Sequence, residues 1–207
     1  MAIKPILFNT EMVRAILDGR KTCTRRIVRP PYFVDGDKND KRSLITLRTA
    51  TKNSSLYRQI GQMPYPDAPY RMCDILYVRE TWYKGLERYI YRADYSDTEK
   101  FYRDGKEIEM KWHPSLHMPK EAARIWLRVT DVRVERLQEI TGQDVLKEGL
   151  NSHVHPQASY FDGNQREMFE KLWNSTIKKS DLDRYGWDAS PYVWVIEFAR
   201  CEKPEEV

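Results

Sequence analysis

The chain has 207 residues, of which 41% are hydrophobic and 32% are charged, which is typical of one globular domain with a substantial core. Its three cysteines lie far apart and form no CxxC pair, which argues against a disulfide framework and a zinc ribbon. With no secretory leader or membrane span recognisable, we expect a cytoplasmic single domain over residues 1–207 that binds no metal and no cofactor, and its oligomeric state stays open.

The net charge of +4 is concentrated near the N-terminus. Residues 11–29 contain six basic and two acidic side chains, so this segment carries the whole excess of positive charge. Such clustering favours an anionic partner, above all nucleic acid, although a run of charge is also typical of a solvated surface. The six basic residues are Arg14, Arg20, Lys21, Arg25, Arg26 and Arg29.

The first elements are a short strand and a short helix. A strand is predicted at 6–8, and a helix at 11–18 has its apolar residues at helical spacing. Thr10 is the expected N-cap, and Gly19 fits the position just past the helix end. Residues 21–29 follow as an extended segment.

Two polar segments interrupt the regular pattern, and we interpret both as insertions. The first, 36–69, is rich in turn formers. A buried strand at 75–78 separates it from the second, 84–118, which mixes aromatic and charged residues. Within the second insertion a strand is predicted at 90–95 and a turn at 104–105.

Regular patterning returns in the second half of the chain. Alternation over 124–137 predicts a long half-buried strand with a bulge near Asp131. Thr141 and Asp144 have the spacing of a capping box, which begins a short helix that Gly149 ends. A helix over 164–177 and an apolar strand over 192–198 follow. Short strands with small helices at their ends predict an α+β fold built on a compact mixed β-barrel.

The stretch LDGRKTCTRR fits the pattern G-x-K-x-x-x-x-R through Gly19, Lys21 and Arg26, and it follows a strand and a short helix. Further along come DILYVRE after an acidic turn, a long strand ending RVERL, a capped helix leading to KEGL, and the closing strand VWVIEF. In these segments and their order the chain resembles the ASCH domain family of the PUA-like superfamily. The amino-acid sequence of these segments is most similar to that of phage- and prophage-encoded ASCH proteins. The resemblance implies a PUA-like mixed β-barrel with short flanking helices and the two insertions.

Some small bacterial ASCH proteins are N4-acetylcytidine amidohydrolases, with a catalytic Lys and Thr three residues apart and a Glu on a later short helix. The resemblance carries these roles to Lys21, Thr24 and Glu148. The residue types suit the chemistry, because Thr24 can attack an acyl carbon, Lys21 can take its proton, and Glu148 can hold Lys21 or move a proton to the leaving nitrogen. On a regular strand positions i and i+3 face opposite ways, so this reading requires residues 20–23 to turn or bulge.

The remaining candidates are binding residues. Arg20, Arg25 and Arg26 are predicted to attract a nucleic-acid anion, and Arg26 can bind phosphate or steady an oxyanion. Trp82 can stack on a base and Glu80 can accept from an exocyclic amine. A core tryptophan and an ion-paired glutamate are the plain alternatives for these two.

The sequence therefore predicts recognition of nucleic acid or a modified nucleoside, with RNA and DNA both open, together with amide hydrolysis of an N4-acetylcytidine-type substrate. A non-catalytic RNA- or DNA-binding module is the first alternative, in which Thr24 is an ordinary strand residue. A phage protein that binds a host factor and an ASCH-type nuclease are the others.

Overall fold

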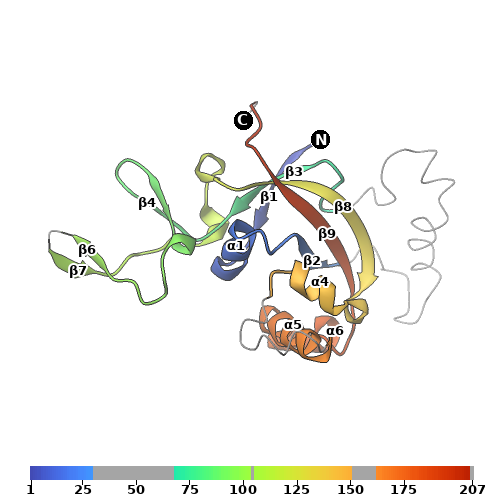
Figure 1. The fold of residues 1–207 in the computed structure, drawn as a ribbon. Coiled ribbons are helices and arrows are strands. Elements are labelled where there is room, and N and C mark those ends of the chain that lie inside the picture. The colour runs from blue at the N-terminus through green and yellow to red at the C-terminus, as the bar shows by residue number, and fades with distance from the viewer. Residues whose placement is uncertain (30–67, 104, 151–161, 206–207) are drawn as a thin grey trace.

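The computed structural model describes residues 1–29, 68–103, 105–150 and 162–205 (Figure 1). The predicted insertion at 36–69 lies outside the described residues except for its last two positions. Within the described part, no helix is long and apolar enough to cross a membrane.

A five-stranded mixed sheet forms the centre of the fold. Its strands hydrogen-bond in the order β1-β3-β8-β9-β2, with β1 parallel to β3 and the other neighbours antiparallel. The long strands β8 and β9 curve through the molecule (Figure 1). The α+β class is confirmed, but the predicted barrel is not closed: across the described residues no strand ladder joins the edge strands β1 and β2. The five strands are β1 (Ile3–Leu7), β2 (Cys23–Ile27), β3 (Ile75–Arg79), β8 (Trp126–Arg136) and β9 (Tyr192–Cys201).

Helix α1 (Thr10–Leu17) lies between β1 and β2 in the chain. Its N-cap is Asn9, whose side chain accepts from the backbone N–H of Met12, so the prediction of Thr10 is wrong by one residue. Asn and Thr are both good caps, and only the backbone geometry decides between neighbours. Gly19 has a φ of +75° and occupies the position after the C-cap, as predicted.

The second insertion forms an arm that extends away from the sheet (Figure 1). The predicted strand at 90–95 is right only to Tyr91, because a 3-10 turn, η1 (Arg92–Asp94), replaces its second half. There the Arg92 guanidinium donates to the carbonyls of Tyr95 and Ser96, which curls the chain. The arm contains two hairpins and two further 3-10 turns: β4 (Trp82–Lys84) with β5 (Tyr89–Tyr91), β6 (Phe101–Arg103) with β7 (Lys106–Ile108), η2 (Ser115–His117) and η3 (Lys120–Ala122).

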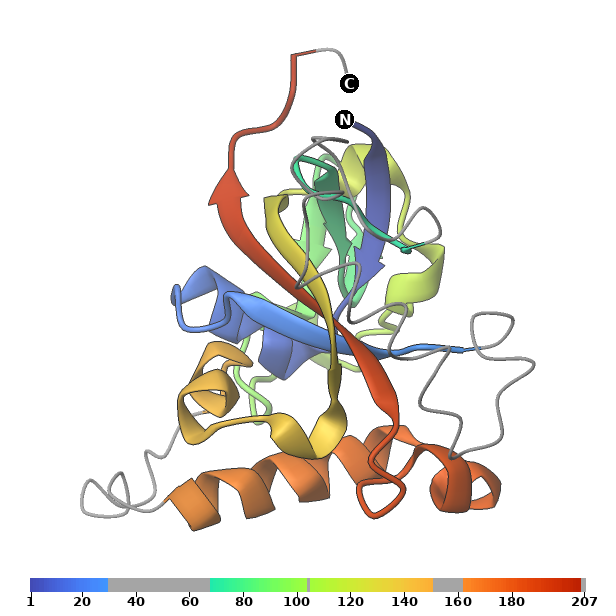
Figure 2. The ribbon, with the colours of Figure 1, turned by 90° about the vertical axis from the view of Figure 1, so that its right-hand side faces the viewer.

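The helices of the second half form a layer beside one face of the sheet (Figure 2). The capping box of Thr141 and Asp144 is confirmed, and it starts a six-residue helix whose C-cap is Glu148. The bulge of β8 is confirmed between Val129 and Asp131. The elements of this layer are η4 (Leu137–Glu139), α4 (Gly142–Lys147), α5 (Asp162–Thr176), η6 (Lys179–Asp181) and α6 (Leu182–Tyr185).

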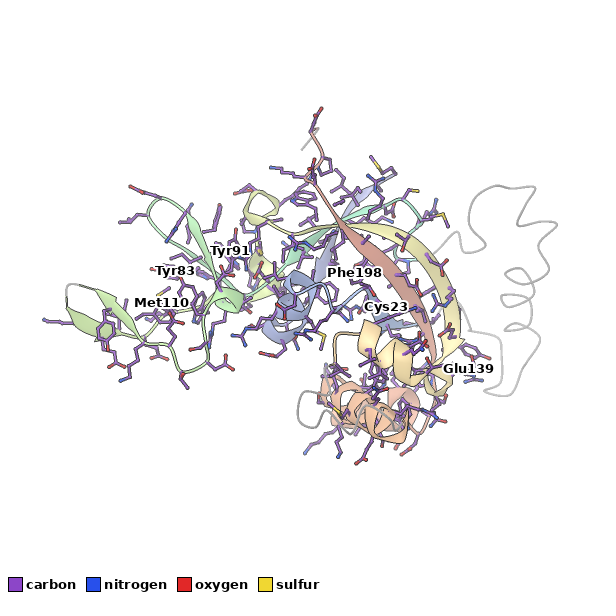
Figure 3. All side chains as sticks on the ribbon, in the orientation of Figure 1. Cys23, Tyr83, Tyr91, Met110, Glu139 and Phe198 are labelled. Carbon is purple, nitrogen blue, oxygen red and sulfur yellow. The ribbon has the colours of Figure 1, made fainter. Side chains whose placement is uncertain are left out.

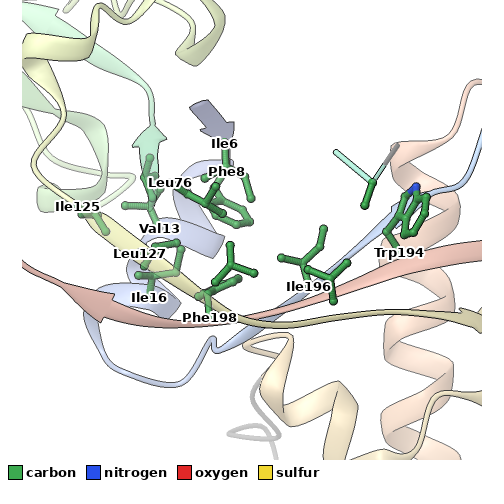
Figure 4. Packing of buried hydrophobic residues seen from close by; sticks show 14 of the residues in the cluster. Ile6, Phe8, Val13, Ile16, Leu76, Ile125, Leu127, Trp194, Ile196 and Phe198 are labelled. Atoms are coloured by element: carbon green, nitrogen blue, oxygen red, sulfur yellow. The ribbon is translucent and has the colours of Figure 1, made fainter. Parts of the chain in front are cut away.

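Two apolar clusters cover the two faces of the β2–β9 ladder. One contains Phe8, Trp194 and Ile196 together with residues of α1 (Figure 4). The other contains Val193 and Val195 with apolar side chains of α4 and α5. Because side chains alternate along a strand, β2 offers successive residues to different clusters. This alternation positions the residues of the candidate site.

Candidate functional site

The chain turns at residues 20–22, between α1 and β2. The backbone N–H groups of Arg20 and Lys21 both donate to the carbonyl of Ala15, at 2.9 Å each. Strand β2 begins only at Cys23. The turn that the predicted Lys21 and Thr24 pair requires is therefore present, and a regular strand from residue 20 onward is excluded.

This turn also closes the C-terminal end of α4. Three successive carbonyls there accept from three successive residues of the turn: Lys147 from the Thr22 N–H at 2.9 Å, Glu148 from the Lys21 amine at 2.9 Å, and Gly149 from the Arg20 guanidinium at 2.6 Å. Carbonyls at a helix end have no partner within the helix, so these bonds satisfy them. The turn and α4 are thus held as one unit.

Gly149 allows the close approach of these two segments. Its φ is +88°, and a Cβ placed there would lie 2.7 Å from the Cβ of Ala15 and 2.9 Å from the Cβ of Lys21. Both distances are shorter than side chains tolerate, so this position combines the left-handed backbone of a helix end with a lack of space.

The Lys21 amine is buried and fully hydrogen-bonded. It donates to the Cys23 carbonyl at 2.8 Å, to the Glu148 carbonyl, and to the Glu148 carboxylate at 2.8 Å. The amine also lies 5.5 Å from the centre of the Phe8 ring. The Lys21 and Glu148 side chains are 1% and 6% exposed. Burial lowers the pKa of Lys21 below its ordinary value, against an opposing effect of the Glu148 charge.

Arg25 holds the other oxygen of the Glu148 carboxylate, at 3.2 Å. Its guanidinium also lies 3.4 Å from Glu135 and 3.8 Å from Asp144, and the side chain is only 1% exposed. Its Nε is buried and has no hydrogen-bond partner among the described residues. Arg25, predicted as a nucleic-acid contact, is therefore enclosed by protein carboxylates in this structure.

Thr24 faces away from that carboxylate group. It pairs with Ile196 across the β2–β9 ladder, and directly opposed residues share a face, which places its side chain on the Phe8 side of the sheet. Thr24 is a buried residue, and its hydroxyl is not among the buried polar atoms of the described chain that lack a hydrogen-bond partner. The Lys21 amine is bound to the Cys23 carbonyl, which precedes Thr24, and it contacts both the Glu148 carboxylate on one side of the sheet and the Phe8 ring on the other.

Arg26 lies on the same face as Thr24. Its guanidinium donates to the Leu7 carbonyl at 3.0 Å and lies 5.5 Å from the centre of the Phe8 ring. Since Leu7 ends β1, this bond joins the two edge strands of the sheet through a side chain. Arg26 carries no ion pair within the described residues, so its charge is the one at this site that a protein carboxylate does not neutralise directly.

The clustered positive charge of residues 11–29 is mostly neutralised by the fold. Arg14 pairs with Glu11 and Asp97, and Arg20 pairs with Asp18. Lys21 and Arg25 are paired as described above. Of the six basic residues, only Arg26 and Arg29 lack an ion pair in the part of the chain that the structure describes. The clustering of basic residues in the sequence therefore suggests a stronger positive electrostatic field, available to attract an anion, than the folded protein presents.

Sequence reasoning missed four residues of this cluster. Cys23 is buried beside α4 (Figure 3), and burial raises the pKa of its thiol to about 12. Phe8 supplies the ring over Lys21 and Arg26, and Glu135 and Asp144 face Arg25. Asp144 is recognisable from sequence as a cap, but no pattern links it or Glu135 to a strand more than a hundred residues earlier.

Glu80 and Trp82 have protein partners of their own. Both oxygens of the buried Glu80 carboxylate accept from Arg124, at 2.9 and 3.0 Å. Trp82 is buried in a third cluster, with its ring 5.6 Å from that of Tyr89 and 4.9 Å from that of His113. No hydrogen bond or ion pair connects either residue to Lys21 or Glu148 within the described chain. Their predicted contacts with a base stay predictions.

The described residues contain no group of three or more His, Cys, Asp or Glu side chains arranged to hold a metal ion. Lys21, Thr24 and Glu148 supply an amine, a hydroxyl and a carboxylate. Such a set can transfer protons and supply an oxygen nucleophile.

Comparison with known proteins gives one structural likeness. No protein-family model matches the chain, and no curated protein matches its sequence. The chain is similar to a solved structure described as "High resolution crystal structure of ASCH domain from Lactobacillus crispatus JV V101", at 11% identity and a TM-score of 0.37, covering 96% of this chain and 79% of that one. Because that TM-score is low, the likeness carries no argument about residues or function.

Proposed function

We propose that the chain is an ASCH-type, PUA-like protein that recognises a modified nucleoside and hydrolyses an exocyclic amide on it, of the N4-acetylcytidine type. The observation that supports the proposal is the buried Lys21–Glu148 ion pair, whose amine binds the backbone carbonyl directly before Thr24, itself a buried residue. In this proposal Thr24 supplies the hydroxyl nucleophile.

The ion pair supplies the base in this proposal. A proton that moves from the Lys21 ammonium to the Glu148 carboxylate across their 2.8 Å hydrogen bond leaves a neutral amine and a neutral acid. Burial favours this neutral pair, because it disfavours charge on Lys21. The amine then takes the Thr24 proton as the hydroxyl oxygen bonds to the acyl carbon.

The leaving group requires a proton. When the carbon–nitrogen bond breaks, the cytosine amine leaves with a proton from Lys21, and Glu148 returns its proton to the lysine. The acyl group then stands as an ester on Thr24, which water hydrolyses to regenerate the hydroxyl. Arg26, on the Thr24 face without a carboxylate partner, is suited to stabilise the oxyanion of each step.

The test is turnover of N4-acetylcytidine by purified protein, with cytidine and acetate measured by chromatography. Thr24→Ala and Lys21→Ala should abolish it. Thr22→Ala is the matched control, because Thr22 is an exposed threonine two positions away whose contacts are made by its backbone. Absence of turnover by the wild-type protein, on the free nucleoside and on acetylated oligonucleotides alike, would refute the hydrolase.

One observation favours a second candidate, a non-catalytic binding module. The three protons of the Lys21 ammonium already have three acceptors, which is what a purely structural lysine requires. In that case Thr24→Ala leaves ligand affinity and stability nearly unchanged, while Lys21→Ala unfolds the site. The pair of variants therefore separates the two candidates.

A further inference from the structure

A second set of arginines lies at the far end of β2 from the Lys21 turn. The Arg184 guanidinium lies 5.0 Å from the centre of the Tyr185 ring, and that of Arg29 lies 6.0 Å from the same ring. The Arg136 guanidinium lies 3.8 Å from the centre of the Tyr192 ring. We call these five residues the stacked-arginine patch.

The backbone brings the parts of this patch together from four elements. Val28 donates to the Tyr192 carbonyl at 3.0 Å, so Arg29 emerges beside the start of β9. Arg136 and Tyr192 are directly opposed in the β8–β9 ladder. Tyr185 ends α6, in the helical layer beside the sheet (Figure 2). The patch is thus a meeting point of strand ends and a helix end.

Within the described part of the chain no carboxylate binds the arginines of the patch, in contrast to six other arginines. In the described ranges, Arg29, Arg136 and Arg184 enter no ion pair, and the neighbouring Asp183 and Asp188 enter none either. Other arginines are neutralised at close range, as the ion pairs of six of them show: Arg14, Arg20, Arg25, Arg92, Arg124 and Arg133.

An aromatic ring within about 6 Å attracts a guanidinium without using its N–H groups. Arg29 and Arg184 are exposed, and Arg136 is half-buried with one N–H group on the Ser190 carbonyl. A guanidinium with free N–H groups can bind phosphate, because two parallel N–H bonds match two phosphate oxygens. None of the large hydrophobic side chains exposed in the described chain belongs to the patch, which argues against insertion into a membrane.

We infer that the stacked-arginine patch binds the phosphodiester backbone of a polynucleotide, so that the modified base reaches the Lys21 site as part of a strand. The hydrolysis of that base rests on the function proposed above, whereas backbone binding by the patch does not. Thr24 and Arg29 are five residues apart on extended chain, about 16 Å at about 3.3 Å per residue. A nucleic-acid strand that rises about 3.4 Å per nucleotide covers this distance in about five nucleotides.

The experiment measures the affinity of the full chain for a labelled single-stranded RNA of roughly 20 nucleotides, and for DNA of the same sequence, across a range of salt concentrations. The test variant is R29Q/R184Q. Its matched control is R88Q/R128Q, which removes the same charge from two exposed arginines that have no ion pair in the described chain and lie outside the patch. Unfolding midpoints of both variants confirm that the fold is retained.

We expect the slope of log affinity against log salt to fall by about 1.4 in R29Q/R184Q, since each lost phosphate contact on a single strand is worth about 0.7. The control should keep the wild-type slope. Equal slopes in the two variants would overturn the inference, as would binding of acidic phospholipid vesicles, but of neither oligonucleotide, through Arg29 and Arg184.

The same measurements separate this inference from the hydrolase proposal. If oligonucleotide binding depends on the patch but the protein hydrolyses no acetylated substrate, the patch inference is supported and the hydrolase proposal is refuted. If the protein hydrolyses free N4-acetylcytidine but its oligonucleotide affinity is unchanged in R29Q/R184Q, the hydrolase proposal is supported and the patch inference is refuted.

Discussion

The ammonium of Lys21 and the carboxylate of Glu148 form a 2.8 Å ion pair between residues 127 positions apart, with both side chains almost wholly buried. A buried pair of this kind is retained only where both partners and their further hydrogen bonds are in place. Here Arg25 binds the second oxygen of the same carboxylate. Removal of any one member therefore leaves an uncompensated charge in the interior.

Glu148→Gln should lower the free energy of unfolding by about 3–5 kcal/mol, because two buried cations lose their shared carboxylate. Lys21→Met should cost a similar amount. The double variant K21M/E148Q should lose less than the sum of the two, with a coupling energy of about 0.5–3 kcal/mol. Urea unfolding of the four proteins measures this cycle, and additive losses would show that the pair contributes no coupling.

Gly149→Ala should lower the free energy of unfolding by about 1–3 kcal/mol more than Gly19→Ala. Both glycines follow a helix and have positive φ, at +88° and +75°, so both variants bear the backbone cost of about 1 kcal/mol. Only at position 149 does the new Cβ meet other atoms, those of Ala15 and Lys21, while position 19 has nothing within 4 Å. Equal losses in thermal or urea unfolding would mean that the contact with Lys21 relaxes freely.

Cys23 should resist alkylation in the native protein. Its thiol is buried, and its pKa is raised from 9.0 to about 12, so little thiolate forms at neutral pH. Cys73 is exposed and serves as the internal reference. Mass spectrometry after a short iodoacetamide treatment should find the label on Cys73 and not on Cys23, and rapid labelling of both would show that the sheet edge opens readily.

Because of the same thiol, we expect the free energy of unfolding to fall in alkaline solution. A raised folded-state pKa gives a contribution that is complete below pH 9.0 and is lost as the pH rises toward about 12, because only the unfolded thiol ionises there. The slope from this one group reaches at most about 1.4 kcal/mol per pH unit. Cys23→Ala should be less stable at neutral pH yet lose less stability between pH 9 and 11, as urea unfolding at several pH values will show.

Arg124→Met should destabilise the protein in a pH-dependent way. It leaves the buried Glu80 carboxylate without the guanidinium that binds both its oxygens. Burial already raises the pKa of Glu80, and loss of Arg124 raises it further, so stability is retained below the ordinary pKa of 4.5 and lost as the pH rises through the folded-state value. The stability gap from wild type should narrow on acidification, and a gap that widens would contradict this account.

Much of the fold follows from local pattern, and this part of the sequence reasoning holds. The capping box of Thr141 and Asp144, the bulge near Asp131 and the positive φ of Gly19 and Gly149 each depend on a few neighbouring residues. A turn or bulge over residues 20–23 is the condition under which Lys21 and Thr24 share a pocket, and the chain does turn at residues 20–22. The local structures that such patterns predict are present in the folded protein because tertiary contacts favour the same local structures.

What sequence could not supply is the pairing of charges across the fold. Arg25 reads as a surface cation, but the register of β2 against β9 turns it toward α4 and three carboxylates. Thr24, one position earlier, is turned to the opposite face by the same register. Arg124, the ion-pair partner of Glu80, reaches it only because the chain that follows the arm returns to the sheet at that point, and no local sequence pattern predicts this.

Helix α4 has six residues, which is too short to persist by itself in water. The carbonyls of Lys147, Glu148 and Gly149 at its C-terminal end accept from Arg20, Lys21 and Thr22, which lie more than a hundred positions earlier in the chain. Closing so large a loop is among the slow events of folding, so helix and site arise together late on the pathway. Hydrogen exchange at the Thr22 amide thus reports separation of this turn from α4, and the arrangement at Lys21 exists only while the two are joined.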